Sequence, residues 1–150
     1  MLQFCRNLKF EKNNLCRFRG LITPSHLEEY KDKLLKRIEQ QAGVTTGEII
    51  TVTYGVNEDQ IDMEILIPCD KEINLVEPFS FEKKRIIENC LRIRYFGYID
   101  SIKNEVDEIN QYFAQNCLKA TSKAHYIAKD TDQLLKGKSL VDIYIGTEMK

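Results

Sequence analysis

The sequence predicts an α+β fold in which two βαββ repeats form one antiparallel sheet with two helices on one face. Three observations predict it: an internal repeat, a helix pattern that follows a strand pattern in each copy, and two β-branched hairpins. The chain has 150 residues, of which 43% are hydrophobic and 30% charged, as expected for a globular protein with a core.

The internal repeat relates Leu15–Ile38 to Cys90–Phe113, which align without gaps at an offset of 75 residues. The hydrophobic phase matches over a strand and a helix together, which chance rarely produces. The alignment also pairs the arginines of the two copies, Arg17 with Arg92 and Arg19 with Arg94. We therefore expect one domain, 1–150, made of repeat 1 (about 1–70) and repeat 2 (about 79–150).

The first repeat opens with a strand over about Asn14–Ile22, whose side chains alternate between two faces. Thr23 is a natural N-cap and Pro24 suits the first helical position. An apolar stripe at helical spacing follows, formed by Leu27, Tyr30, Leu34, Ile38 and Ala42. Gly43 is placed to end this helix. The segments 48–55 and 61–68 then form a hairpin around the turn 56–60.

The second repeat follows the same order after a link over Asp70–Phe79. Residues 89–97 form its first strand. Asp100 or Ser101 caps a helix whose apolar stripe is Ile102, Val106, Ile109 and Phe113. Residues 122–130 and 139–146 form the closing hairpin, with 131–138 between them.

Strand alternation divides the polar and apolar residues of the hairpins between two faces. Ile61, Met63, Ile65 and Ile67 share the face that should meet the helix. The other face, named here the helix-free face, carries the candidate site residues Glu64, Leu66, Asp142, Tyr144, Arg17, Arg19, Arg92 and Arg94. The repeat matches Glu64 with Asp142 and Leu66 with Tyr144.

Composition excludes several classes of function. The formal net charge of −1 predicts no direct binding of nucleic acid and no attraction to an anionic membrane. The N-terminal dozen residues carry charges where a signal peptide is apolar, so we expect a cytoplasmic protein. The five cysteines form no CxxC pair, and with two histidines they predict neither a metal site nor a cofactor.

The sequence resembles the GyrI-like superfamily, which includes the effector-binding domains of AraC-type regulators of bacteria. The residues that carry the resemblance are "LRIRYFGYIDSIKNEVDEINQYF", the closing "VDIYIG" and the hairpin strand "DMEILIP". The resemblance implies a duplicated βαββ fold with a cleft for small, often aromatic and cationic molecules, with an acidic residue at its floor. Glu64 matches that residue, and Asp142 stands where a glutamate is usual. The chain departs from the family at Gly146, where a proline is usual, and in having no tryptophan.

These observations predict a non-enzymatic module that binds a small molecule, as a stand-alone regulator or a sequestering protein. One alternative is a protein-interaction or inhibitor module that uses the same face, with a protein partner or a second copy of the chain. A small hydrolase that uses Glu64 is a third. Glu64 itself has two interpretations, an anchor for a cationic ligand or an ion pair with Arg17 or Arg19. The arginines also admit an anionic or zwitterionic ligand.

Overall fold

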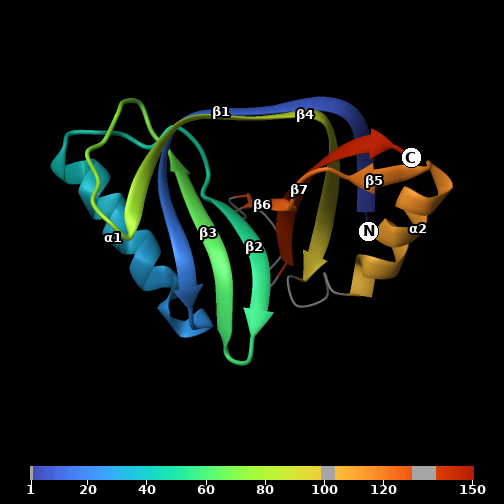
Figure 1. Ribbon diagram of the computed structural model, residues 1–150, viewed down its shortest axis with the longest axis horizontal. Coiled ribbons are helices and arrows are strands. Elements are labelled where there is room, and N and C mark those ends of the chain that lie inside the picture. The colour runs from blue at the N-terminus through green and yellow to red at the C-terminus, as the bar shows by residue number, and fades with distance from the viewer. Residues whose placement is uncertain (1, 99–103, 130–137) are drawn as a thin grey trace. The chain divides into compact units, whose positions relative to one another are not determined.

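The computed structural model describes residues 2–98, 104–129 and 138–150 (Figure 1). Its elements are β1 (Leu2–Ile22), the short 3-10 helix η1 (Pro24–His26), α1 (Leu27–Gln40), β2 (Ile50–Asn57), β3 (Gln60–Pro68), β4 (Phe79–Tyr98), α2 (Val106–Gln115), β5 (Leu118–Ala120), β6 (His125–Ala128) and β7 (Lys138–Met149). Within these residues, seven strands form an antiparallel sheet accompanied by two α-helices, which confirms the α+β class.

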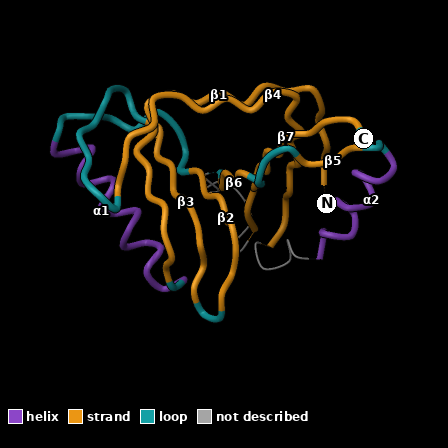
Figure 2. Tube along the Cα trace, viewed as in Figure 1, coloured by secondary structure: helices purple, strands orange, loops and turns teal. Residues whose placement is uncertain are grey.

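The chain divides into two compact units. The first unit is Glu11–Ile86, and the second unit combines Met1–Phe10 with Ile87–Lys150. The long strands β1 and β4 each contribute residues to both units, and Figure 2 shows each of them as a continuous strand. The ten N-terminal residues thus belong to the second unit, although the sequence repeat assigns them to the first half. The duplication itself stays a prediction.

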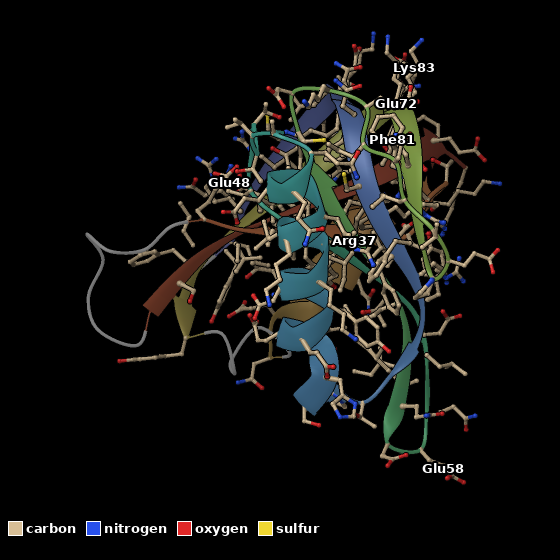
Figure 3. All side chains as sticks on the ribbon, turned by 90° about the vertical axis from the view of Figure 1, so that its left-hand side faces the viewer. Arg37, Glu48, Glu58, Glu72, Phe81 and Lys83 are labelled. Carbon is tan, nitrogen blue, oxygen red and sulfur yellow. The ribbon has the colours of Figure 1, made fainter. Side chains whose placement is uncertain are left out.

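In the first unit, β3 pairs with β1 on one side and with β2 on the other, both antiparallel. The alternation predicted for β3 is confirmed, because Met63, Ile65 and Ile67 are buried in one cluster with Leu34 and Ile38 of α1. The opposite side of α1 is charged and exposed, as Arg37 shows in Figure 3.

In the second unit, β7 pairs antiparallel with β4, β5 and β6. The buried residues of its core are Leu91, Ile93, Val141 and Ile143. One side chain of α2, Tyr112, packs against this core and also stacks on Phe4 of β1, with ring centroids 4.0 Å apart. The N-terminal part of β1 is therefore part of this core.

The two long strands begin well before the expected positions, Asn14 for β1 and Asn89 for β4. Three asparagines explain the difference. Asn7, Asn14 and Asn89 have φ angles of 61°, 54° and 49°, the left-handed conformation that asparagine tolerates and that occurs in β-bulges. Asparagine normally indicates a turn, so the sequence predicts an interruption at positions where the strand continues. Asn14 and Asn89 also correspond at the same offset of 75 residues.

The ends of α1 differ in detail from the prediction. Thr23 precedes the 3-10 turn, where its hydroxyl contacts His26 Nδ1 at 2.8 Å and does not cap a backbone N–H. The helix ends at Gln40, and the left-handed residue that terminates it is Ala42, with φ 60°, rather than Gly43. Ala42 is exposed and so does not belong to the apolar stripe. The expected cap of the second helix at Asp100 or Ser101, its first apolar residue Ile102 and the segment 131–137 lie outside the described residues.

Candidate functional site

Glu64 lies at the centre of the helix-free face of the first unit, with none of its surface exposed to solvent. Arg85 of β4 donates to both of its oxygens, from Nη1 to Oε1 at 2.7 Å and from Nη2 to Oε2 at 2.9 Å. Arg17 Nε donates to Oε2, and the Tyr54 hydroxyl donates to Oε1 at 3.0 Å. Both oxygens of the carboxylate are therefore engaged by side chains of the same unit.

Further ion pairs surround this group. Arg85 also binds Glu82, with Nε 2.6 Å from Oε2. Arg19 binds Asp62 through two hydrogen bonds of 3.0 and 3.1 Å, and its guanidinium lies 3.6 Å from the centre of the Tyr54 ring. In these contacts three arginines face three carboxylates, so the cluster carries no excess charge.

The pKa of Glu64 reflects these contacts. Burial alone would raise it, but the hydrogen bonds from Arg85 and Arg17 outweigh burial and hold the pKa at about 2. Of the two interpretations of Glu64, the geometry therefore shows the ion pair. Its partners are Arg17 and Arg85, whereas Arg19 pairs with Asp62.

Arg85 is the contact that sequence reasoning missed. It belongs to the run "EKKRII", in which a string of charges usually indicates a solvated face, and that run was not expected to be a strand. The helix-free face is also less open than expected, since Glu64, Leu66 and Asp142 all have 0% exposed surface.

In the second unit, the pairing of β4, β7 and β6 determines which side chains lie next to one another on the helix-free face. Three residues of β4 lie opposite three residues of β7: Arg92 faces Tyr144, Arg94 faces Asp142, and Phe96 faces Leu140. On the far side of β7, His125 faces Tyr144 and Ile127 faces Asp142. The register thus brings together all four of the site residues predicted in the second repeat.

Asp142 is the acidic residue of this face. Arg94 donates to both of its oxygens, from Nε at 2.8 Å and from Nη2 at 2.9 Å, and Lys129 Nζ lies 3.8 Å from Oδ2. Burial would raise the pKa of Asp142, but Arg94 and then Lys129 and Arg92 lower it below its ordinary value. The carboxylate is therefore ionised at neutral pH and bound by Arg94.

Arg92 differs from the other arginines of the two faces. Its Nε is buried and has no hydrogen-bond partner among the described residues. Its cross-strand neighbour Tyr144 packs against Phe10 of β1, with ring centroids 5.1 Å apart, and burial together with Asp142 raises the pKa of the Tyr144 hydroxyl. Arg92 therefore lies beside the aromatic ring of Tyr144, and its Nε–H has no acceptor among the described residues.

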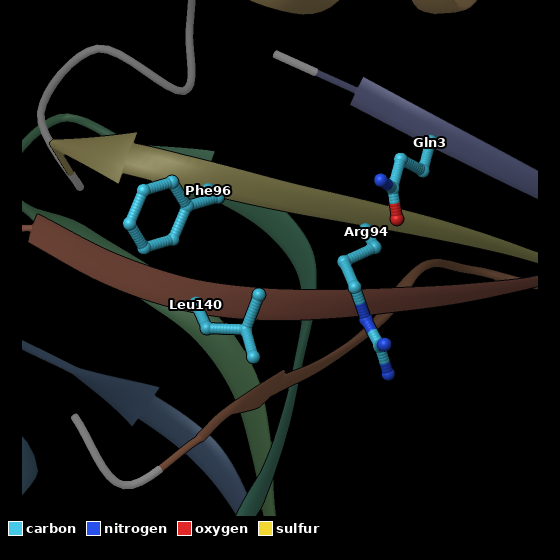
Figure 4. A pocket seen from close by; sticks show the side chains of 4 residues that line it. All are labelled: Gln3, Arg94, Phe96 and Leu140. Atoms are coloured by element: carbon cyan, nitrogen blue, oxygen red, sulfur yellow. The ribbon is translucent and has the colours of Figure 1, made fainter. Parts of the chain in front are cut away.

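A pocket of about 240 Å³ opens on this face of the second unit, lined by Gln3, Arg94, Phe96 and Leu140. Figure 4 shows Phe96 and Leu140 on one side of the pocket and Gln3 with Arg94 on the other. Of these four residues, only Arg94 was predicted. Phe96 could have been found, because it shares its strand face with Arg92 and Arg94.

Other kinds of site are not seen in the described ranges. No group of three or more His, Cys, Asp or Glu residues there could hold a metal ion. Cys16, Cys69 and Cys90 are buried free thiols, whereas Cys117 is exposed. None of the helices in these ranges is long and apolar enough to cross a bilayer.

No protein-family model and no curated protein sequence matches the chain. Solved structures do resemble it. The EcmrR C-terminal domain superposes with a TM-score of 0.74 at 12% identity, covering 100% of this chain and 99% of that domain. In the EcmrR–DNA complex the TM-score is 0.72 at 14% identity, and the match covers 99% of this chain but only 58% of the EcmrR chain.

Two further proteins share the fold. A hydrolase from Listeria innocua has a TM-score of 0.66 at 9% identity, covering 98% of this chain and 91% of that one. SAV2435 bound to tetraphenylphosphonium has a TM-score of 0.50 at 9% identity, covering 99% and 94%. At such low identity these likenesses show the fold alone, and they confirm the predicted α+β class of two helices with a large antiparallel sheet.

Proposed function

We propose that this chain is a non-enzymatic module that binds a small molecule in the pocket of the second unit. The observation that carries the proposal is the pocket itself, where the apolar Phe96 and Leu140 face the polar Gln3 and Arg94. Ligand sites typically combine apolar walls with a few polar groups that orient the ligand. Arg94 suits that role, because 34% of its side chain is exposed although it is bound to Asp142.

The eight site residues predicted from sequence then divide into two groups. Arg94 lines the proposed ligand site, Asp142 is its cross-strand partner, and Arg92 and Tyr144 form the neighbouring pair on the same strands. Glu64, Leu66, Arg17 and Arg19 support the structure of the first unit, because Glu64 and Leu66 are fully buried and Arg17 and Arg19 are held by carboxylates.

The shared fold supports small-molecule binding in general, since SAV2435 has this fold and binds tetraphenylphosphonium. Hydrolysis is less well supported, although a protein of this fold is a hydrolase. A pKa of about 2 makes Glu64 a weak base, and its oxygens are already taken by two arginines. A role as a regulator or in sequestration is compatible with ligand binding, and a protein-interaction module remains the alternative.

A thermal-shift screen of the full chain tests the proposal. The panel should contain single-ring aromatic compounds that are anionic, neutral and cationic. We expect at least one class to raise the melting temperature in a concentration-dependent manner, and Phe96→Ala to abolish the effect. Val56→Ala is the matched control, since Val56 is 71% exposed on β2 of the first unit. If no class stabilises the chain, and a pull-down yields one stoichiometric protein partner, the alternative replaces the proposal.

A further inference from the structure

We propose that the ligand of this pocket is an anion, specifically a small aromatic or similarly apolar carboxylate, and not a cation. The inference rests on the proposed function and concerns the charge of the ligand. It follows from a difference between two equivalent faces of the chain.

In the first unit, the arginines of the helix-free face are fully matched. Glu64 binds Arg17 and Arg85, Arg85 also binds Glu82, and Asp62 binds Arg19. No guanidinium of this group has a charge that lacks a carboxylate partner. A ligand anion would have to displace an existing ion pair there.

In the second unit, the arginines of the helix-free face are not fully matched by carboxylates. Asp142 is the carboxylate that contacts the arginines of this face among the described residues, and Arg94 occupies both of its oxygens. Arg92 is electrostatically close to the same carboxylate, yet its buried Nε has no hydrogen-bond partner among the described residues. A buried cationic donor without a partner is unfavourable, and a carboxylate bound beside Arg94 would offset the charge of Arg92 through space.

Arg94 also keeps donors for a ligand. A guanidinium has five N–H groups, and Arg94 directs only its Nε and one Nη2 hydrogen to Asp142. The remaining N–H groups are on Nη1 and Nη2 of a side chain that lines the pocket. Arg92 lies two residues away on the same strand face, about 7 Å along the strand, so one carboxylate can be drawn to both arginines.

The rest of the pocket selects the body of the ligand. Phe96 and Leu140 offer apolar surface beside Arg94, and a ring can pack there while its carboxylate faces the arginines (Figure 4). The volume of about 240 Å³ is smaller than that of sites for drug-sized ligands, which suits one ring rather than several. A cation would be repelled by Arg94 in the pocket wall and by Arg92 two residues away, and the oxygens of Asp142 are already bound by Arg94.

The experiment compares benzoate, benzamide and benzylamine, which present one ring with a negative, neutral or positive group. Binding to the full-length chain is measured by isothermal titration calorimetry at low and high salt. We expect benzoate to bind and benzylamine not to, with weaker benzoate binding at high salt. Arg92→Gln should weaken benzoate binding about tenfold, the loss expected for a charge-assisted contact.

Arg19→Gln is the matched control, because Arg19 is the repeat equivalent of Arg94 but lies in the balanced cluster of the first unit. It should leave benzoate affinity unchanged. Urea unfolding of each variant shows whether it is folded, and if Arg92→Gln is not, Arg92→Lys replaces it. Benzylamine binding better than benzoate, or equal benzoate affinity in wild type and the Arg92 variant, overturns the inference while leaving small-molecule binding intact. If none of the three compounds binds, and the thermal-shift screen of charged and neutral aromatics also finds no stabilising compound, the proposed function itself is overturned.

Discussion

Glu64 and Asp142 hold equivalent places in the two units, since Arg19 lies opposite Glu64 and Arg94 lies opposite Asp142 in the strand registers. The contacts nevertheless differ. Arg94 binds Asp142 across the strands, whereas Arg19 turns to the exposed Asp62 and leaves Glu64 to Arg17 and Arg85. One fold position thus supports a closed ion-pair cluster in one unit and a partly open one in the other.

Loss of the Glu64 charge should destabilise the protein strongly. Glu64→Gln leaves Arg17 and Arg85 without their shared carboxylate, although both side chains retain some exposure, 26% and 17%. We expect a loss of about 2–4 kcal/mol in the free energy of unfolding, measured by urea titration. The control Asp62→Asn breaks a pair that is 37% exposed on both sides and should cost only about 0–1 kcal/mol. Equal losses for the two variants would contradict the structural role of Glu64.

The same contacts predict how stability depends on pH. The pKa of Glu64 is about 2 in the folded chain against an ordinary value of 4.5, because the hydrogen bonds from Arg85 and Arg17 outweigh the effect of burial. Since folding lowers this pKa, the stabilisation is complete above about pH 5 and is lost as the pH falls toward 2. The difference amounts to roughly 3 kcal/mol.

Urea unfolding at pH 7, 5, 4 and 3 measures this dependence. Wild type should lose stability below about pH 5 more steeply than Glu64→Gln, which lacks the titrating group. Parallel curves for the two proteins would show that Glu64 does not have a lowered pKa.

At the scale of elements, periodicity predicted the core well. The apolar stripes of α1 and β3 predicted that each element buries one side. The structure confirms this, with one buried cluster that contains Leu34, Ile38, Met63 and Ile65. Periodicity failed where single residues bend a strand, because Asn14 and Asn89 look like turns until tertiary pairing holds them inside β1 and β4. The prediction of the candidate site was incomplete for the same reason. Arg92 and Arg94 followed from strand parity, but the contact of Gln3 with the pocket depends on a strand that was not expected.

Two adjacent residues after α1, Ala42 and Gly43, can be substituted to test which of them terminates the helix. Ala42 adopts φ 60°, where glycine is favoured, so Ala42→Gly should raise the free energy of unfolding by about 0.5–1 kcal/mol. Gly43 has a different role. A Cβ there would lie 2.9 Å from Ile38 Cγ2 and 3.0 Å from Ile73 Cδ1, so Gly43→Ala should lower stability by about 1–3 kcal/mol.

Thermal and urea unfolding of both variants measure these opposite effects. Gly55→Ala serves as the control, because a Cβ at Gly55 would meet no atom within 4 Å. Stabilisation by Gly43→Ala would contradict the close approach of Ile38 and Ile73 to Gly43. Destabilisation by Ala42→Gly would contradict the left-handed conformation of Ala42.

At the scale of the whole molecule, the units do not follow the order of the chain. The second unit needs Met1–Phe10 from the opposite end of the sequence, and Leu2 and Phe4 pack against its core. The pocket depends on the same segment through Gln3. A sequence repeat does not reveal that Met1–Phe10 belongs to the second unit. A repeat compares segments along the chain, and it contains no information about which segments pair in the folded protein.

This organisation predicts that the N-terminal strand stabilises the second unit selectively. Phe4→Ala removes the ring that stacks on Tyr112 at 4.0 Å, and since Phe4 is only partly buried we expect a loss of about 1–3 kcal/mol. Hydrogen exchange should accelerate in α2 and β7 while β3 keeps its protection, because locally destabilised regions open before the rest. Phe18→Ala is the converse control, since Phe18 is 2% exposed in the core of the first unit and should affect β3 first. If either variant accelerates exchange equally in β3 and β7, the two units unfold as one, and selective stabilisation by the N-terminal strand is wrong.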